Sequence, residues 1–250
     1  MKTEIALFMF LSLVGLLPCQ AQTTEGLGKT IRTNELTVEN APNWVTQNRV
    51  ERIIARVQDK LEWTTRRTTV RCFADAASFA KSHSLGPHAL AVTSALGENA
   101  KILLGPKVTD ANFDQALSHE LVHVIVVQKY KGAIPKWLEE GLANHLARTG
   151  QVDYKWLAKQ TLPKDVRELA HPMLRAADSG RTMGQSLHFR YQASQALAEM
   201  LDKKCDLLNL VRMSVGKNME TYIGTMCEIK DLTKTFQDWI TKKAKGSFNG

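Results

Sequence analysis

The chain has 250 residues, a net charge of +8 and 44% hydrophobic residues, enough apolar material for one large or two small folded domains. Its 33 lysines and arginines are scattered along the chain and are not interleaved with aromatic residues. This pattern gives little support to nucleic-acid binding. We expect the positive charge to favour solubility and attraction to anionic surfaces or peptides.

The first 21 residues have the layout of a secretory signal peptide. Lys2 is followed by an apolar stretch over 5–17, then by Pro18 and by small residues before a cut after Ala21. The apolar stretch is shorter than the ~20 residues that cross a bilayer as a helix. A lipoprotein anchored through Cys19 is the less favoured alternative, because a proline precedes this cysteine where such signals need a small residue. We therefore expect a secreted or periplasmic protein with no stable membrane insertion after signal removal.

Beyond the signal segment, residues 22–43 are polar and rich in threonine, and a flexible N-terminal tail is predicted there. The remaining residues, 44–250, are expected to form one domain. Its first half, about 44–108, carries strand signals, and its second half, about 109–250, shows mainly helical patterns. The sequence thus predicts an α+β fold in which a small mixed β-sheet precedes a helical half.

In the first half, Val50, Ile53, Ile54, Val57 and Leu61 recur at helical spacing and predict an amphipathic helix over 44–63. Shorter segments follow: strands over 68–73, 89–96 and 101–104, and a helix over 76–82.

In the second half, Asp110 is a good N-cap for a helix that is expected to run to Tyr130 and to stop at Gly132. Pro135 suits the first position of a further helix that ends near 148. Later helices are predicted over 165–177, 186–202, 206–215 and 231–243.

Three cysteines remain after signal removal: Cys72, Cys205 and Cys227. An odd number cannot pair completely, and the absence of a CxxC pair argues against a cysteine-based zinc site. We expect a bridge between Cys205 and Cys227, with Cys72 as a buried thiol.

The main chemical signal is His119-Glu120-Leu121-Val122-His123, which matches H-E-x-x-H. Residues four apart share one face of a helix, so both imidazoles can reach one metal ion. Glu120 points about 100° away from His119, where it can reach the water that the metal activates without being a ligand. The apolar neighbours predict a buried helix, in which such polar groups need partners. The motif therefore predicts a zinc site with Glu120 as general base.

A second motif contains Trp137, Glu140, Gly141 and Ala143 at the spacing W-x-x-E-G-x-A. Together the two motifs resemble the gluzincin metallopeptidases, the group of thermolysin and the zinc aminopeptidases, and are most similar to their small peptidase-MA-like relatives. This resemblance implies a zincin-like fold, one Zn²⁺ per chain and Glu140 as the third ligand. The small Gly141 and Ala143 are expected to let this helix closely approach the one that carries His119.

Three polar residues near Glu140 are not expected to be metal ligands. Asn144 lies one turn further on the same face, and related enzymes often place a polar residue there to support a histidine ligand, so it is the candidate outer partner. Glu139 is expected to be a solvated or supporting acid. His145 lies on a different face and is not expected to be a ligand.

The oxyanion of peptide hydrolysis needs a stabiliser besides the metal. The segment from His188 to Leu197 is similar to the Y-x-x-(G/S) helix start of the same family, which implies that role for Tyr191. His188, three residues earlier on the same helical face, is held in reserve.

The sequence therefore predicts an exported zinc peptidase, a hydrolase whose peptide or protein substrate lies extended along an edge strand near 89–104. Two alternatives stay open. One is zinc-dependent hydrolysis of a non-peptide amide, such as one in a cell-wall fragment. The other is a catalytically silent, zinc-stabilised binding module, although such a site needs neither Glu120 nor Tyr191 and would usually close with a fourth protein ligand.

Overall fold

A computed structural model describes residues 6–10, 28–85, 89–97, 99–170 and 183–246. The chain divides into two compact units, 1–128 and 129–250. The first contains a mixed β-sheet with helices, and the second is helical, so the α+β prediction is confirmed. The division falls after residue 128 rather than near 108, because the histidine-bearing helix packs with the sheet.

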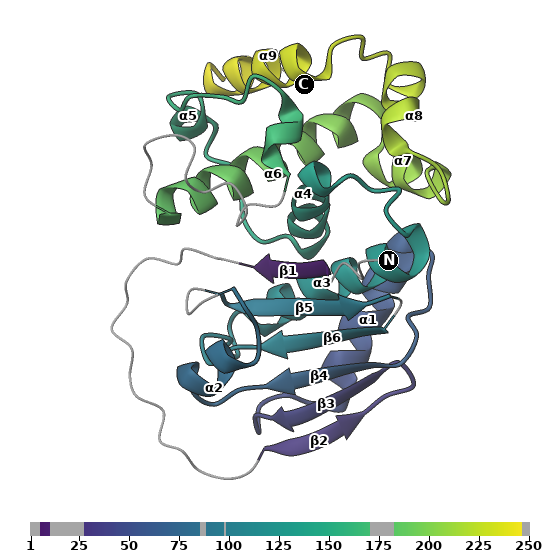
Figure 1. Cartoon of the computed structure of the whole chain (residues 1–250), viewed down its shortest axis with the longest axis vertical. Coiled ribbons are helices and arrows are strands. Elements are labelled where there is room, and N and C mark those ends of the chain that lie inside the picture. Colours follow the sequence, from purple (N-terminus) through teal and green to yellow (C-terminus); the bar gives the residue numbers. More distant parts are fainter. Residues whose placement is uncertain (1–5, 11–27, 86–88, 98, 171–182, 247–250) are drawn as a thin grey trace. The chain divides into compact units, whose positions relative to one another are not determined.

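Unit 1 is built on one six-stranded sheet with the order β1-β5-β6-β4-β3-β2 (Figure 1). The strands are β1 (Ala6–Phe10), β2 (Lys29–Arg32), β3 (Leu36–Ala41), β4 (Thr68–Cys72), β5 (Ala91–Leu96) and β6 (Asn99–Leu104). β4 is parallel to both β3 and β6. The other neighbouring pairs are antiparallel, as predicted for a mixed sheet.

The predicted N-terminal tail is wrong over residues 29–41, which form β2 and β3. Alternate residues of β3, among them Leu36 and Val38, are buried, and the β-branched threonines that suggested a polar tail also favour strands. Between the strands, the hydroxyl of Thr33 accepts a hydrogen bond from the Leu36 amide at 2.9 Å. Residues 22–27 of this segment lie outside the described residues. In the predicted signal peptide, only β1 (Ala6–Phe10) is described.

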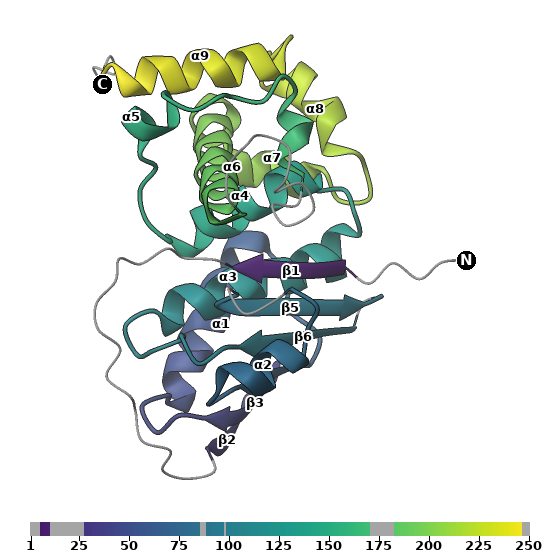
Figure 2. The same cartoon turned by 60° about the vertical axis from the view of Figure 1, so that its left-hand side comes forward.

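The helices of unit 1 are α1 (Gln47–Leu61), α2 (Ala76–Lys81) and α3 (Phe113–Ile125). α1 and α3 lie together on one face of the sheet in both cartoon views (Figures 1 and 2). α1 begins at the N-cap Thr46 and buries all five apolar residues that predicted it. That prediction is confirmed.

The start of α3 differs from the prediction. Asn112, not Asp110, occupies the N-cap position. Asp110 instead pairs with Arg49 of α1, which also contacts Asp114 at 2.5 Å and lies 5.2 Å from the ring centroid of Phe113. Asp110 therefore takes part in an ion pair that links α1 to the start of α3, and it does not act as a cap. The helix ends at Ile125, and the predicted continuation is a π-helix, Val126–Tyr130.

Unit 2 contains α4 (Lys136–Ala147), α5 (Tyr154–Leu157), α6 (Met183–Cys205), α7 (Leu207–Met213), α8 (Met219–Met226) and α9 (Leu232–Ala244). Pro135 is the N-cap of α4, one position before the predicted one. The helix predicted over 165–177 is only a 3₁₀ turn at Val166–Leu169, while residues 171–182 lie outside the described residues. α5 and α8 were not predicted, because segments of 4 and 8 residues carry little periodicity.

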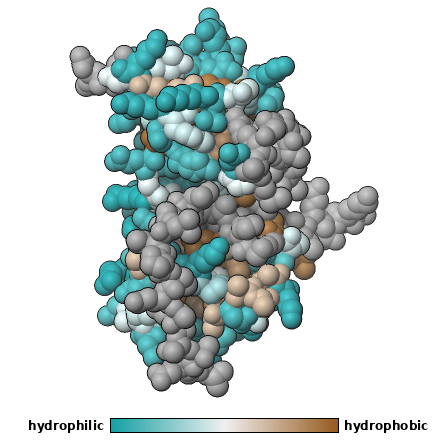
Figure 3. Space-filling model, turned by 90° about the vertical axis from the view of Figure 1, so that its left-hand side faces the viewer, coloured by the Kyte–Doolittle hydropathy of each residue, from teal (hydrophilic) through white to brown (hydrophobic). Residues whose placement is uncertain are grey.

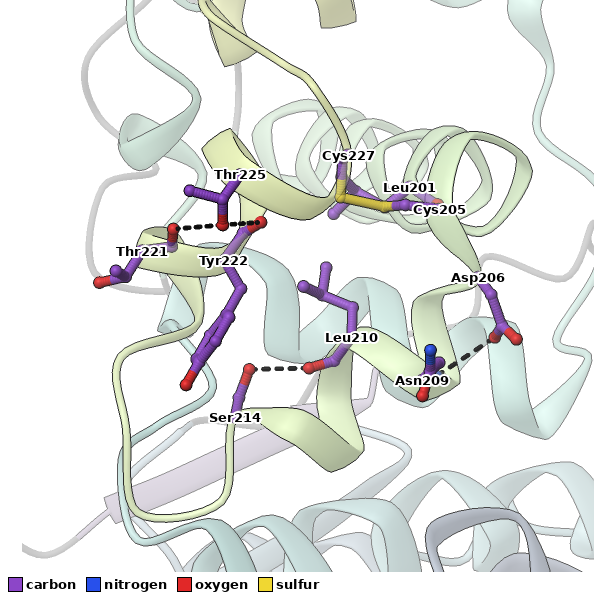
Figure 4. The surroundings of a disulfide bond; sticks show 10 residues. All are labelled: Leu201, Cys205, Asp206, Asn209, Leu210, Ser214, Thr221, Tyr222, Thr225 and Cys227. Atoms are coloured by element: carbon purple, nitrogen blue, oxygen red, sulfur yellow. Dashed lines mark hydrogen bonds between the residues drawn. A yellow bond between two sulfur atoms is a disulfide. The ribbon is translucent and has the colours of Figure 1, made fainter.

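A disulfide joins Cys205 at the end of α6 to Cys227, which follows α8 (Figure 4). The predicted pairing is confirmed, and closing a loop between residues 22 apart adds roughly 3 kcal/mol to the stability of the fold. Among the described cysteines Cys72 remains a thiol, half-buried rather than buried. Desolvation raises its pKa to about 12, so it is not a reactive thiolate. A bridge of this kind is compatible with an oxidising compartment.

Two further features concern the surface and the helices. On the face shown in Figure 3, hydrophilic side chains predominate among the described residues, with smaller apolar patches between them, as expected of a solvated exterior. Within the described part of the chain, every helix is too short or too polar to cross a membrane.

Candidate metal centre

α3 carries the H-E-x-x-H residues at buried positions. All residues from Ala116 to Ile125 are buried, because apolar side chains occur on every side of this helix. The side chains of His119, Glu120 and His123 are fully buried. Polar groups at such positions are costly unless they are bound by a partner.

His119 and His123 lie one turn apart, and their rings meet edge to face. The ring centroids are 4.8 Å apart at an angle of 71°, and the two Nε2 atoms approach to 3.1 Å. Residue spacing alone explains this arrangement, since positions i and i+4 stack on one face of a helix. Two nitrogen donors are thus directed at a common point.

A residue of the β-sheet binds the side chain of Glu120. The hydroxyl of Thr93 in β5 lies 2.6 Å from Oε2 of Glu120, to which it donates a hydrogen bond. The same hydroxyl lies 3.2 Å from the backbone oxygen of Glu120, and Thr93 is fully buried. Thr93 is a functional candidate that the sequence did not identify. Its contact with Glu120 joins two residues that are 27 positions apart in the chain.

Glu140 lies in α4, a helix that is buried along most of its length. One donor atom each from His119, His123 and Glu140 lies within 4.8 Å of the other two, and all three side chains are buried. The predicted ligands therefore form a group that could hold a metal ion.

Within unit 2, the packing of α4 explains the glycine of the second motif. A Cβ atom on Gly141 would lie 2.0 Å from the carbonyl oxygen of Ser194 in α6 and 3.3 Å from the Cβ of Ala198. The close approach that Gly141 permits within unit 2 is thus to α6, a partner that the sequence did not indicate. Any side chain at position 141 would force α4 and α6 apart.

Hydrogen bonds fix the start of α4. The indole of Trp137 donates to Oε1 of Glu220 at 3.0 Å, and Arg167 donates to Oε2 of the same carboxylate at 2.8 Å. The hydrogen bond from Arg167 is the largest cause that lowers the pKa of Glu220, and the Trp137 bond acts in the same direction. The tryptophan of the W-x-x-E-G-x-A motif therefore anchors the helix that carries Glu140.

The structure also gives the contacts of the three residues near Glu140 that the sequence analysis discussed. Glu139 is buried and pairs with Lys136 at 2.9 Å, so it is not the solvated acid that was one of its two predicted roles. His145 faces Asp202 at 3.5 Å, as expected of a residue outside the ligand group. Asn144 is buried, and its side-chain oxygen accepts a hydrogen bond from Thr149 at 3.1 Å. Its support of a histidine ligand stays a prediction.

The candidate oxyanion residues lie in α6. Tyr191 is buried, whereas His188 is half-buried and packs on Trp156 with ring centroids 4.6 Å apart. Desolvation lowers the pKa of His188, against a smaller opposing effect of Asp153. His188 therefore packs against an aromatic ring at a tilt and has a lowered pKa. The oxyanion role of Tyr191, with His188 in reserve, stays a prediction.

The chain matches no protein-family model, no curated protein and no solved structure. What can be inferred about its function therefore depends on the residues and their geometry.

Proposed function

We propose that this protein is a zinc-dependent peptidase of the gluzincin type, with a zincin-like fold. The observation that carries the proposal is the buried group of His119, His123 and Glu140, with the buried carboxylate of Glu120 on the same helix as the two histidines. Two imidazoles and one carboxylate are the donor set of catalytic zinc sites that keep an open position for water or substrate.

The spacing of the donors suits zinc. The Nε2 atoms of His119 and His123 lie 3.1 Å apart, close to the ~3.3 Å expected of two nitrogens bound to one tetrahedral Zn²⁺. Magnesium and calcium prefer oxygen ligands, so two nitrogen donors argue against them.

Each residue has a task in hydrolysis. His119, His123 and Glu140 would hold a zinc ion, and a bound ion would supply the Lewis acidity that lowers the pKa of water and polarises a carbonyl group. Glu120 accepts the proton of the attacking water and passes it to the leaving amine. Tyr191 donates a hydrogen bond to the oxyanion as negative charge develops on the carbonyl oxygen.

An extended peptide is the substrate that the sheet favours. β1 pairs antiparallel with the outer edge of β5, from Ala6 opposite Ala95 to Phe10 opposite Ala91. Because β1 lies in the predicted signal peptide, its removal would leave this edge open to another extended chain. Main-chain pairing tolerates varied side chains. Thr93 of β5 contacts Glu120, so a peptide on this edge would pass close to the base.

This edge favours a peptide substrate over a non-peptide amide. Glu120 and Tyr191 argue against a silent binding module, because a purely structural zinc site needs neither residue and would usually close with a fourth protein ligand. Export also fits the proposal. The Cys205–Cys227 bridge suits a secreted or periplasmic location, and a signal peptide over 1–21 would direct the chain there.

The test combines metal analysis with cleavage of a mixed peptide library. The exported protein should contain one zinc per chain and cleave the library. His123→Ala should lose the metal, whereas His145→Ala, a change on the helix that carries Glu140, should keep it. Glu120→Gln should keep zinc and lose nearly all hydrolysis, because it removes proton transfer without removing a ligand. A His123→Ala protein with a full equivalent of zinc, or an active Glu120→Gln protein, would refute the assignment.

A further inference from the structure

Thr93 is an unusual residue for its position in the sheet. It lies in β5 between Ala91 and Ala95, which share its face of the strand, and all three are buried. Valine has nearly the same shape and would place no hydroxyl in this interior. A buried hydroxyl on an otherwise apolar face therefore needs a partner, and Glu120 is that partner at 2.6 Å.

The strand gives Thr93 a fixed position. β5 is paired along its length with β6, with Thr93 opposite Ile102, and this pairing does not depend on the signal peptide. A β-branched side chain also has few χ1 rotamers. The hydroxyl is thus held by a rigid element, whereas Glu120 has three rotatable side-chain bonds. A hydrogen bond to a charged acceptor in a buried site is strong enough to select one of the Glu120 rotamers.

The proposed base, Glu120, can act only if one suitable side-chain rotamer is selected. Glu120 follows His119 directly and so points about 100° away from it around the helix axis. Its carboxylate reaches the attacking water only in some rotamers. Misplacement by about 1 Å can lower an enzymatic rate on the order of 100-fold.

We propose that Thr93 is a positioning residue for Glu120. Its hydroxyl binds Oε2 and so orients the carboxylate with Oε1 toward the water whose proton it accepts. This inference depends on the proposed function, because it assigns the geometry of the same catalytic base.

Kinetics of Thr93→Val test the role. This variant keeps the shape of the side chain and removes the donor. We expect kcat to fall about 10- to 100-fold, with KM and the content of one zinc per chain unchanged. Thr93→Ser should recover most of the loss, because it restores the hydroxyl. Thr68→Val is the matched control, since Thr68 is a buried strand threonine that donates to the backbone oxygen of Arg66 at 2.9 Å. It should reduce stability and leave kcat unchanged.

The results that would contradict the role of Thr93 differ from those that would refute the proposed peptidase function. Wild-type kcat in Thr93→Val, beside an inactive Glu120→Gln, would overturn the positioning role and leave the peptidase assignment intact. Loss of zinc from Thr93→Val would also overturn it, because Thr93 would then act on the ligands. A wild-type protein that binds zinc but cleaves no peptide would refute the proposed function first, and this role with it.

A second measurement needs no activity. In metal-free protein, the melting temperature of Thr93→Val should fall in the wild-type background, because the Glu120 carboxylate loses a buried donor. In a Glu120→Leu background the same change should be neutral or stabilising, because both partners are then apolar. Equal shifts in the two backgrounds would show that Thr93 and Glu120 are not coupled and would overturn the proposal.

Discussion

The two sequence motifs that carry the candidate metal ligands are held in place by different means. In unit 1, His119 and His123 are four residues apart on α3, so the regular helix alone brings their Nε2 atoms to 3.1 Å. In unit 2, Glu140 is the only member of the group on α4, and its place depends on how α4 packs against α6 through Gly141 and Ser194. The first arrangement is local geometry and the second is tertiary packing.

This difference has consequences for mutation. Substitutions around α3 that preserve its helical state should preserve the spacing of the two histidines. Substitutions in the contact between α4 and α6 should displace Glu140 even when no ligand is changed. The helical unit is therefore where the ligand group is most sensitive to packing.

Gly141→Ala should have the largest effect. Its new Cβ would lie 2.0 Å from the Ser194 carbonyl oxygen, a distance that backbone atoms cannot accommodate without moving apart. We expect a loss of more than about 3 kcal/mol in the free energy of unfolding, measured by urea denaturation, together with weaker zinc binding.

Gly224→Ala is the matched control, because Gly224 is an exposed glycine within α8 whose Cβ would meet nothing within 4 Å. That change should be stabilising by roughly 0.5–1 kcal/mol. Equal effects of the two substitutions would show that the close contact of α4 with α6 does not exist.

Tyr191→Phe addresses the chemical role of the helical unit. If its hydroxyl stabilises the oxyanion, kcat should fall about 100- to 1,000-fold while KM changes little, because the hydrogen bond forms only in the transition state. Steady-state kinetics and a melting curve on one variant measure both quantities. A normal kcat with a lowered melting temperature would move the assignment to His188.

Tyr154→Phe provides the control for Tyr191. The Tyr154 hydroxyl donates to Glu199 at 2.7 Å and accepts from the Trp239 indole at 3.0 Å, so it links α5, α6 and α9. Loss of this hydroxyl should cost about 1 kcal/mol of stability and leave kcat unchanged. A fall in kcat as large as that of Tyr191→Phe would mean that stability, and not transition-state binding, explains both.

Features that depend on local spacing could be predicted from the sequence. The apolar positions of α1 and the pairing of His119 with His123 are of this kind. Strands β2 and β3 were missed because a Thr-rich polar segment has no strong periodic signal, and their burial becomes evident only against β4. The partner of Gly141 within unit 2 was missed because a small residue indicates a close approach but not the element approached.

The contact between Thr93 and Glu120 is a second example of tertiary packing that local sequence patterns cannot predict. A strand was predicted over 89–96, yet the sequence could not tell which of its residues lies opposite the α3 carboxylate. That contact joins positions 27 residues apart, and helix and strand registers must both be known to find it. The sequence therefore located the chemical groups of the site, whereas the groups that orient them required the packed structure.

The smallest expected effect concerns the anchor of α4. The hydrogen bond from Arg167 lowers the pKa of Glu220 from its ordinary value of 4.5. A lowered folded-state pKa means that the ionised carboxylate stabilises the fold above the unfolded pKa, and that this contribution is lost as the pH falls through the folded pKa. Glu220→Gln should keep the acceptor for Trp137 and lose the charge, at a cost below about 1 kcal/mol at neutral pH, since Arg167 is largely exposed. Urea denaturation should show this difference vanishing in acid, whereas Asp238→Asn, in an exposed pair with Lys234, should show little difference at either pH. A Glu220→Gln deficit of the same size at neutral and acidic pH would mean that the carboxylate acts through packing, and the start of α4 would then be held by the indole and not by charge.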